Sequence, residues 1–118
     1  MDEKTFKERT KRLGISVIGL VAKLPRSVAA ETIGRQIVRS STSVGANYRA
    51  VCRAKSTADM INKLKVVEEE ADETAYWLEV LTESKILDQT QVATLAKETD
   101  EIIAMTVASI KTLRGRKS

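Results

Sequence analysis

The chain has no histidine and a single cysteine among its 118 residues. One cysteine, Cys52, cannot form an internal disulfide, which is typical of a reduced, intracellular protein. Without histidine, the usual zinc-ligand sets and many cofactor sites are incomplete. We therefore expect a cytoplasmic protein with no metal and no cofactor.

Proline, glycine and aromatic residues are also scarce. The sequence contains one proline, five glycines, one tryptophan, two tyrosines and one phenylalanine. Strands are rich in aromatic residues and need turn residues between them, so a β-rich fold is excluded. A chain of this length supports one core. We expect an all-α fold, with residues 1–118 forming a single domain.

The sequence also lacks an apolar run long enough to span a bilayer. The longest candidate, KRLGISVIGLVAKLP, has the basic lead and apolar segment of a signal peptide. However, Asp2, Glu3 and Glu8 make the lead acidic as well as basic, and Lys23 interrupts the run before Pro25. We expect neither a membrane span nor cleavage here.

Apolar residues recur at steps of three and four along four segments, which is the spacing of amphipathic helices. This periodicity predicts helices at about 4–24, 26–54, 57–84 and 88–113, followed by a basic tail, 114–118. Pro25, a capping-box pattern at Ser56 and a candidate cap at Asp88 mark the boundaries. Because the connections are short, successive helices must run antiparallel. The predicted architecture is an up-down-up-down antiparallel four-helix bundle.

The stretch RSSTSVGANYRA, from Arg39 to Ala50, has the composition of a loop but continues the helical spacing of Ile37, Val44 and Tyr48. A phosphate-binding loop would need a preceding strand and a terminal Gly-Lys-Ser/Thr, and neither is present. The stretch therefore predicts a helix whose small residues let a neighbouring helix approach closely.

A second apolar set on the first helix comprises Ile15, Ile18 and Ala22. Two interpretations stay open for it. The set either belongs to a wide stripe facing the core or lies on a surface used for self-association.

Charge is distributed in blocks along the chain. Residues 1–55 contain twelve Lys/Arg and four Asp/Glu, residues 56–110 contain the reverse, and the last eight residues contain four Lys/Arg and no acid. Antiparallel helices would bring the starts of the first and third helices and the ends of the second and fourth to one end of the bundle. The cations expected at this basic pole are Lys4, Lys7, Lys11, Arg12, Arg49, Arg53, Lys55, Lys63, Lys111, Arg114 and Arg116.

Such a cluster can neutralise phosphates and release their counterions, so it predicts nucleic-acid binding. The alternative is that these side chains only solvate the surface. Because aromatic side chains for base stacking are scarce, we expect recognition of backbone or shape rather than of bases.

Acidic residues beside the third helix's apolar seam raise the question of catalysis. The carboxylate-bridged di-metal bundles use Glu-x-x-His pairs, which this chain cannot supply. Pairing across the hairpin of the second and third helices instead places Arg39 near Glu73. We therefore expect a buried structural network rather than an active site, whose loss at Glu73 would strongly destabilise the fold. Its expected members are Gln36, Arg39, Asn47, Glu70 and Glu73.

Two segments carry a family resemblance: LPRSVAAETIGRQIVRSSTSVGANYRA and STADMINKLKVVEEEADETAYWLEVL. Together they closely resemble the bacterial four-helix-bundle family encoded in intervening sequences of large-subunit ribosomal RNA genes. The resemblance implies a homopentamer with no known catalytic activity and an association with RNA. More distantly, the chain is similar to the accessory subunit of diversity-generating retroelements, which partners a reverse transcriptase.

These observations favour a non-enzymatic, oligomeric bundle that binds nucleic acid, with RNA favoured, through its basic pole. The alternative is a protein-interaction scaffold or an accessory subunit of a nucleic-acid enzyme such as a reverse transcriptase.

Overall fold

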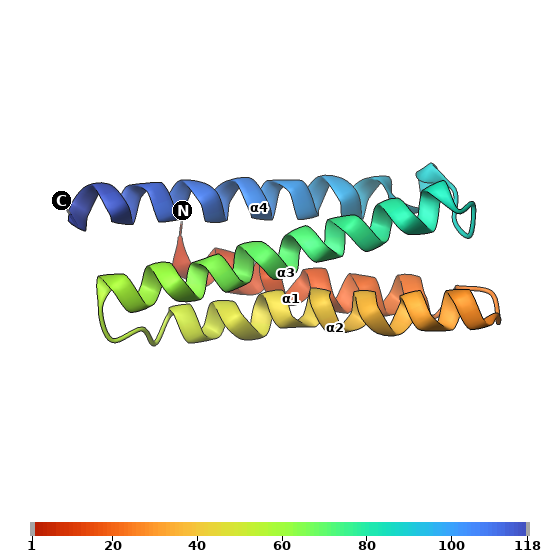
Figure 1. Ribbon diagram of the computed structural model, residues 1–118, viewed down its shortest axis with the longest axis horizontal. Coiled ribbons are helices and arrows are strands. Elements are labelled where there is room, and N and C mark those ends of the chain that lie inside the picture. The colour runs from red at the N-terminus through yellow and green to blue at the C-terminus, as the bar shows by residue number, and fades with distance from the viewer. Residues whose placement is uncertain (1, 118) are drawn as a thin grey trace.

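The computed structural model describes residues 2–117, apart from the side chain of Lys117. It contains four helices: α1 (Glu3–Val21), α2 (Val28–Val51), α3 (Thr57–Glu83) and α4 (Gln89–Lys117). They form an antiparallel up-down-up-down bundle about 50 Å long and 20 Å across, with all four helix axes nearly parallel (Figure 1). The predicted all-α four-helix bundle is confirmed.

Polar caps set the starts of the helices. The Ser27 hydroxyl accepts a hydrogen bond from the Ala30 amide at the start of α2, and the Ser56 hydroxyl accepts one from the Asp59 amide at the start of α3. At the start of α4, the Asp88 carboxylate accepts a bond from the Thr90 amide, and the Gln91 side chain accepts a 3.0 Å bond from the Asp88 amide. These caps satisfy amide groups that have no partner within the helix.

Three helix ends differ from the sequence prediction by three or more residues. α2 ends at Val51 rather than at residue 54. α1 ends at Val21, four residues before Pro25, so proline does not itself terminate the helix. α4 continues to Lys117, so the predicted tail is wrong over residues 114–117; Ser118 lies outside the described residues. A single glycine costs a helix only about 1 kcal/mol, so Gly115 does not stop α4.

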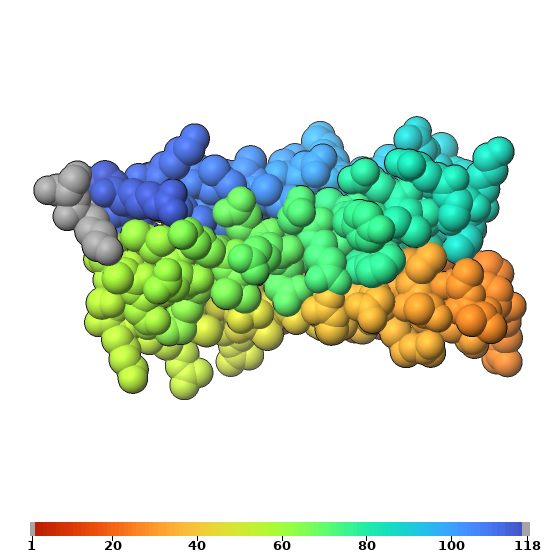
Figure 2. Space-filling model, in the orientation of Figure 1, coloured from red at the N-terminus to blue at the C-terminus, as the bar shows by residue number. Residues whose placement is uncertain are grey.

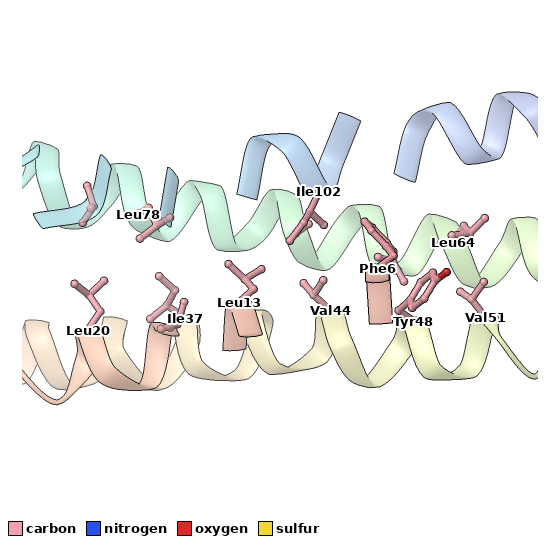
Figure 3. Packing of buried hydrophobic residues seen from close by; sticks show 14 of the residues in the cluster. Phe6, Leu13, Leu20, Ile37, Val44, Tyr48, Val51, Leu64, Leu78 and Ile102 are labelled. Atoms are coloured by element: carbon pink, nitrogen blue, oxygen red, sulfur yellow. The ribbon is translucent and has the colours of Figure 1, made fainter. Parts of the chain in front are cut away.

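The core runs along the whole rod and uses the predicted apolar stripes (Figure 3). At one end, the rings of Phe6 and Tyr48 meet edge to face with centroids 4.7 Å apart. Leu13 and Ile37 continue the α1 and α2 side of the core, and Ile102 faces them from α4 (Figure 3).

The stretch RSSTSVGANYRA is helical, as predicted, and forms the middle and end of α2. Gly45 faces the α1 backbone so closely that a Cβ atom there would lie 3.1 Å from the Thr10 carbonyl oxygen. Ser40 is fully buried and its hydroxyl lies 2.9 Å from that of Thr74 on α3. The small polar residues of this stretch therefore make α2 fit tightly between α1 and α3.

Ile15 and Ile18 lie outside this core, with 47% and 50% of their surface exposed. The interpretation that they widen the core-facing stripe of α1 is therefore wrong for the single chain. Within residues 2–117, no helix is both long and apolar enough to cross a membrane.

Candidate nucleic-acid interface at the basic pole

Four helix termini meet at one end of the rod. The starts of α1 and α3 and the ends of α2 and α4 line a common groove of about 500 Å³, which includes Glu3, Tyr48, Met60 and Arg116. Figure 1 shows the N-terminus towards this end and the C-terminus at it, beside the turn between α2 and α3. Figure 2 shows the last turns of α4 lying against that turn. We call this end the basic pole.

A second groove of about 550 Å³ runs from the basic pole along the seam between α1 and α2. Lys4, Lys7 and Lys11 line it from α1, and Arg49 lines it from α2. Four of the predicted binding residues therefore share one surface. The spacing of the α1 lysines at three and four residues places them on one face of the helix.

Most of the predicted cations are exposed. Lys63 is half-buried, and the other ten are exposed to solvent. Within the described residues, eight of the eleven have no recorded ion pair: Lys4, Lys7, Arg49, Arg53, Lys55, Lys111, Arg114 and Arg116. These eight come from α1, α2, α4 and the turn between α2 and α3, whereas the predicted cation of α3, Lys63, is paired.

Three of the predicted cations are paired with acids of their own helix. Glu8 lies 2.9 Å from the Arg12 Nε and 3.2 Å from the Lys11 Nζ. The hydrogen bond from Arg12, followed by that from Lys11, lowers the pKa of the Glu8 carboxyl. Lys63 lies 2.5 Å from Asp59, and this contact likewise lowers the pKa of Asp59. These pairs were not predicted, although their spacing of three and four residues on one helix is the sequence signal for them.

Arg9, another cation in this part of α1, is committed to the contact between α1 and α4. Its guanidinium lies 2.6 Å from Glu98 and 3.0 Å from Glu101, and it also contacts the Met105 sulfur. The bond to Glu98, more than that to Glu101, raises the pKa of Arg9 above its ordinary value. Arg9 therefore contributes to helix packing and adds little net charge to the pole.

The polar network between α2 and α3 differs in two respects from its prediction. Arg39 contacts Gln36, Glu70 and Glu73, and Glu73 also accepts a 3.0 Å bond from the Trp77 indole. The network is not buried, because 46% of the Arg39 side chain is exposed.

Asn47 lies outside the network, because its amide donates a 2.8 Å bond to the Ser43 carbonyl oxygen of its own helix. The hydrogen bond from Arg39, followed by that from Trp77, lowers the pKa of Glu73 and keeps it ionised.

In the part of the chain that the structure describes, no group of three or more Cys, Asp or Glu side chains could hold a metal ion. Both carboxylates beside the seam, Glu70 and Glu73, serve as ion-pair partners of Arg39.

The sequence matches the family model for 23S rRNA-intervening sequence proteins over residues 3–108. The chain belongs to this family. Its fold is also that of a crystal structure of a protein of unknown function from the S23 ribosomal protein family of Bacteroides thetaiotaomicron. That protein is 32% identical, with a TM-score of 0.86, and the match covers 94% of this chain and 99% of the other. A search of curated proteins finds no match. The family resemblance expected from the sequence is confirmed.

Proposed function

We propose that this member of the 23S rRNA-intervening sequence protein family is a non-enzymatic protein of the cytoplasm that binds RNA through its basic pole. The observation that carries the proposal is the convergence of exposed, unpaired cations from α1, α2, α4 and the turn between α2 and α3 on one end of the rod. A high local density of positive charge attracts phosphates and gives affinity without base readout.

The character of the pole favours contacts to the sugar-phosphate backbone. Phe6 is fully buried and Tyr48 is only 6% exposed, so the two aromatic residues nearest the pole offer no ring for base stacking. The exposed groups there are ammonium and guanidinium groups, which bind phosphate oxygens. We therefore propose that structured RNA is bound by shape and charge, with weak dependence on its sequence.

We further propose that the protein assembles into a homo-oligomer, with five copies as the family resemblance implies. Repetition of the basic pole around a ring would multiply the phosphate contacts available to one RNA molecule. The half-exposed Ile15 and Ile18 lie one turn apart on α1 and support self-association, because covering exposed apolar surface with a second copy is favourable.

The test is fluorescence anisotropy of a labelled hairpin RNA titrated with the full chain at low salt. Saturable binding is expected, together with similar affinity for a hairpin of unrelated sequence. The absence of binding at low salt would overturn the proposal. A strong preference for one single-stranded sequence would show that bases rather than backbone are recognised.

A further inference from the structure

The largest exposed apolar side chains fall into two patches on different sides of the bundle. On α1, Ile15 and Ile18 stand on the wall of the groove between α1 and α2. On α3, Tyr76 is 55% exposed and packs edge to face against Trp77, with ring centroids 4.9 Å apart. Tyrosine and tryptophan are the residues most often found at the energetic centres of protein interfaces.

The two patches carry opposite charge. The groove that contains Ile15 and Ile18 also contains the cations Lys4, Lys7, Lys11 and Arg49, with Glu8 as its one acid. The outer face of α3 around Tyr76 carries exposed carboxylates one and two turns away on either side. They are Glu69, Asp72, Glu79 and Glu83. A negative face of this kind repels nucleic acid and attracts a basic protein surface.

The two patches also lie at the same level along the rod. Gly14 on α1 approaches Thr42 on α2, where an added Cβ would lie 3.2 Å from the Thr42 Cα. Two residues along α2, Ser40 is hydrogen-bonded to Thr74 on α3. Because α1 and α3 run in the same direction (Figure 1), these contacts place Ile18 level with Tyr76.

A single molecule cannot join its own patches. α1 and α3 lie diagonally opposite each other in the bundle, and no Cα atom of one comes within 8 Å of a Cα atom of the other. Two copies lying side by side in the same orientation would, however, bring Ile18 of one copy against Tyr76 of the other. Lys11, two turns before Ile18, would then face Glu69, two turns before Tyr76.

We propose that the groove between α1 and α2 receives the α3 face of a second copy of this chain, centred on Tyr76. The contact joins two different surfaces, so each copy keeps one free surface of each kind and can add a further copy until a ring closes. Lys4, Lys7 and Arg49 lie towards the basic pole from the apolar contact. This inference rests on the self-assembly part of the proposed function.

The experiment is light scattering coupled to size exclusion on the full chain and on two variants. Ile15→Asp/Ile18→Asp places two carboxylates in the apolar part of the groove. Tyr76→Asp places one at the centre of the α3 face. Both are expected to be single chains of 13.0 kDa, whereas the unmodified protein is expected to be a larger assembly. Val28→Asp is the matched control, because Val28 is 83% exposed and lies in neither patch; it should retain the assembly. Circular dichroism checks that each variant folds.

Mixing the two monomeric variants gives the sharper result. Each variant keeps the surface that the other has lost, so an equimolar mixture should form a dimer containing one copy of each and nothing larger. A mixture that stays monomeric would overturn the inference, as would either variant forming dimers alone.

Two failures are distinguishable. Variants that keep the mass of a wild-type oligomer would refute this interface but leave self-assembly standing. A wild-type protein that is monomeric at all concentrations would refute both. RNA binding by the monomeric Tyr76→Asp variant, whose basic pole is intact, is measured separately and tests the RNA proposal alone.

Discussion

The hydroxyl of Ser40 on α2 lies 2.9 Å from the hydroxyl of Thr74 on α3, and both residues are completely buried. One hydroxyl donates to the other, and the hydroxyl that accepts donates its own hydrogen to a carbonyl oxygen of its helix, Ile37 for Ser40 or Glu70 for Thr74. The pair thus links two helices inside the core without leaving a polar atom unsatisfied. A buried bond of this kind fixes the register of α2 against α3, because sliding either helix would leave both groups without the other.

A double-mutant cycle measures this link. Ser40→Ala and Thr74→Val each remove one hydroxyl, and each should lower the free energy of unfolding by about 1 kcal/mol. The double variant should lose less than the sum, because the second substitution removes a bond already broken. Denaturant titration gives the values, with Thr42→Ala as a control, since its hydroxyl bonds only within its own helix. Strictly additive losses would show that the two hydroxyls do not interact.

Gly45→Ala should destabilise the protein although alanine is the better helix former. The added Cβ would meet the Thr10 carbonyl oxygen at 3.1 Å and the Lys11 nitrogen at 3.2 Å, and backbone atoms cannot rotate away. Overpacking of this kind costs about 1 to 3 kcal/mol, more than the roughly 1 kcal/mol that alanine contributes to a helix. Thermal unfolding followed by circular dichroism is the measurement.

Gly19→Ala is the matched control for Gly45→Ala. Gly19 also lies in a helix, but an added Cβ there has nothing within 4 Å. This variant should gain roughly 0.5 to 1 kcal/mol from helix propensity alone. A change of stability in the same direction in both variants would contradict the close approach of α1 and α2 at Gly45.

Tyr48 should make stability fall in alkali. Burial, the largest cause, raises the pKa of its phenol from 10.0 to about 12. Above pH 10 the unfolded chain releases a proton that the folded chain keeps, so stability is full below pH 10 and is lost as pH rises towards 12.

The loss attributable to Tyr48 is on the order of 2 kcal/mol. Tyr48→Phe lacks this titration, so unfolding curves of the two proteins at several alkaline pH values isolate its effect from that of the lysines. Parallel loss of stability in both proteins would show that Tyr48 titrates normally.

The four helices and their order could be predicted from the sequence because the buried side chains of each helix recur at steps of three and four residues. Leu64, Val67, Ala71, Thr74 and Leu78 alternate at steps of three and four, and all five are buried. The helix ends were less accurate, because α1 stops at Val21 through its own C-terminal geometry rather than at Pro25.

The burial of the Arg39 network could not be read from periodicity. Glu70 and Glu73 lie beside the α3 seam, and a rotation of the helix by a fraction of a turn decides whether such positions face the core or the solvent. The structure places them at the edge, where Arg39 remains 46% exposed. Exposed pairs contribute little to stability, so the strong destabilisation expected from loss of Glu73 no longer follows.

The charges at the basic pole could also be predicted only in part from the sequence. Connectivity alone predicted that Lys7 and Arg49 would converge, and they line one groove. Connectivity did not predict that Glu8 would pair with Lys11 and Arg12, because that depends on side-chain geometry.

The salt dependence of RNA binding tests the central claim most directly. If about six phosphates are contacted, affinity for a hairpin RNA should fall by roughly a thousandfold between 50 and 200 mM salt. Lys7→Gln/Arg49→Gln should weaken binding and reduce the slope of log K against log salt by about two. Lys23→Gln/Lys85→Gln makes the same change in net charge in the turns at the opposite end, and it should leave the slope unchanged. Equal losses in the two double variants would contradict a binding site at the basic pole.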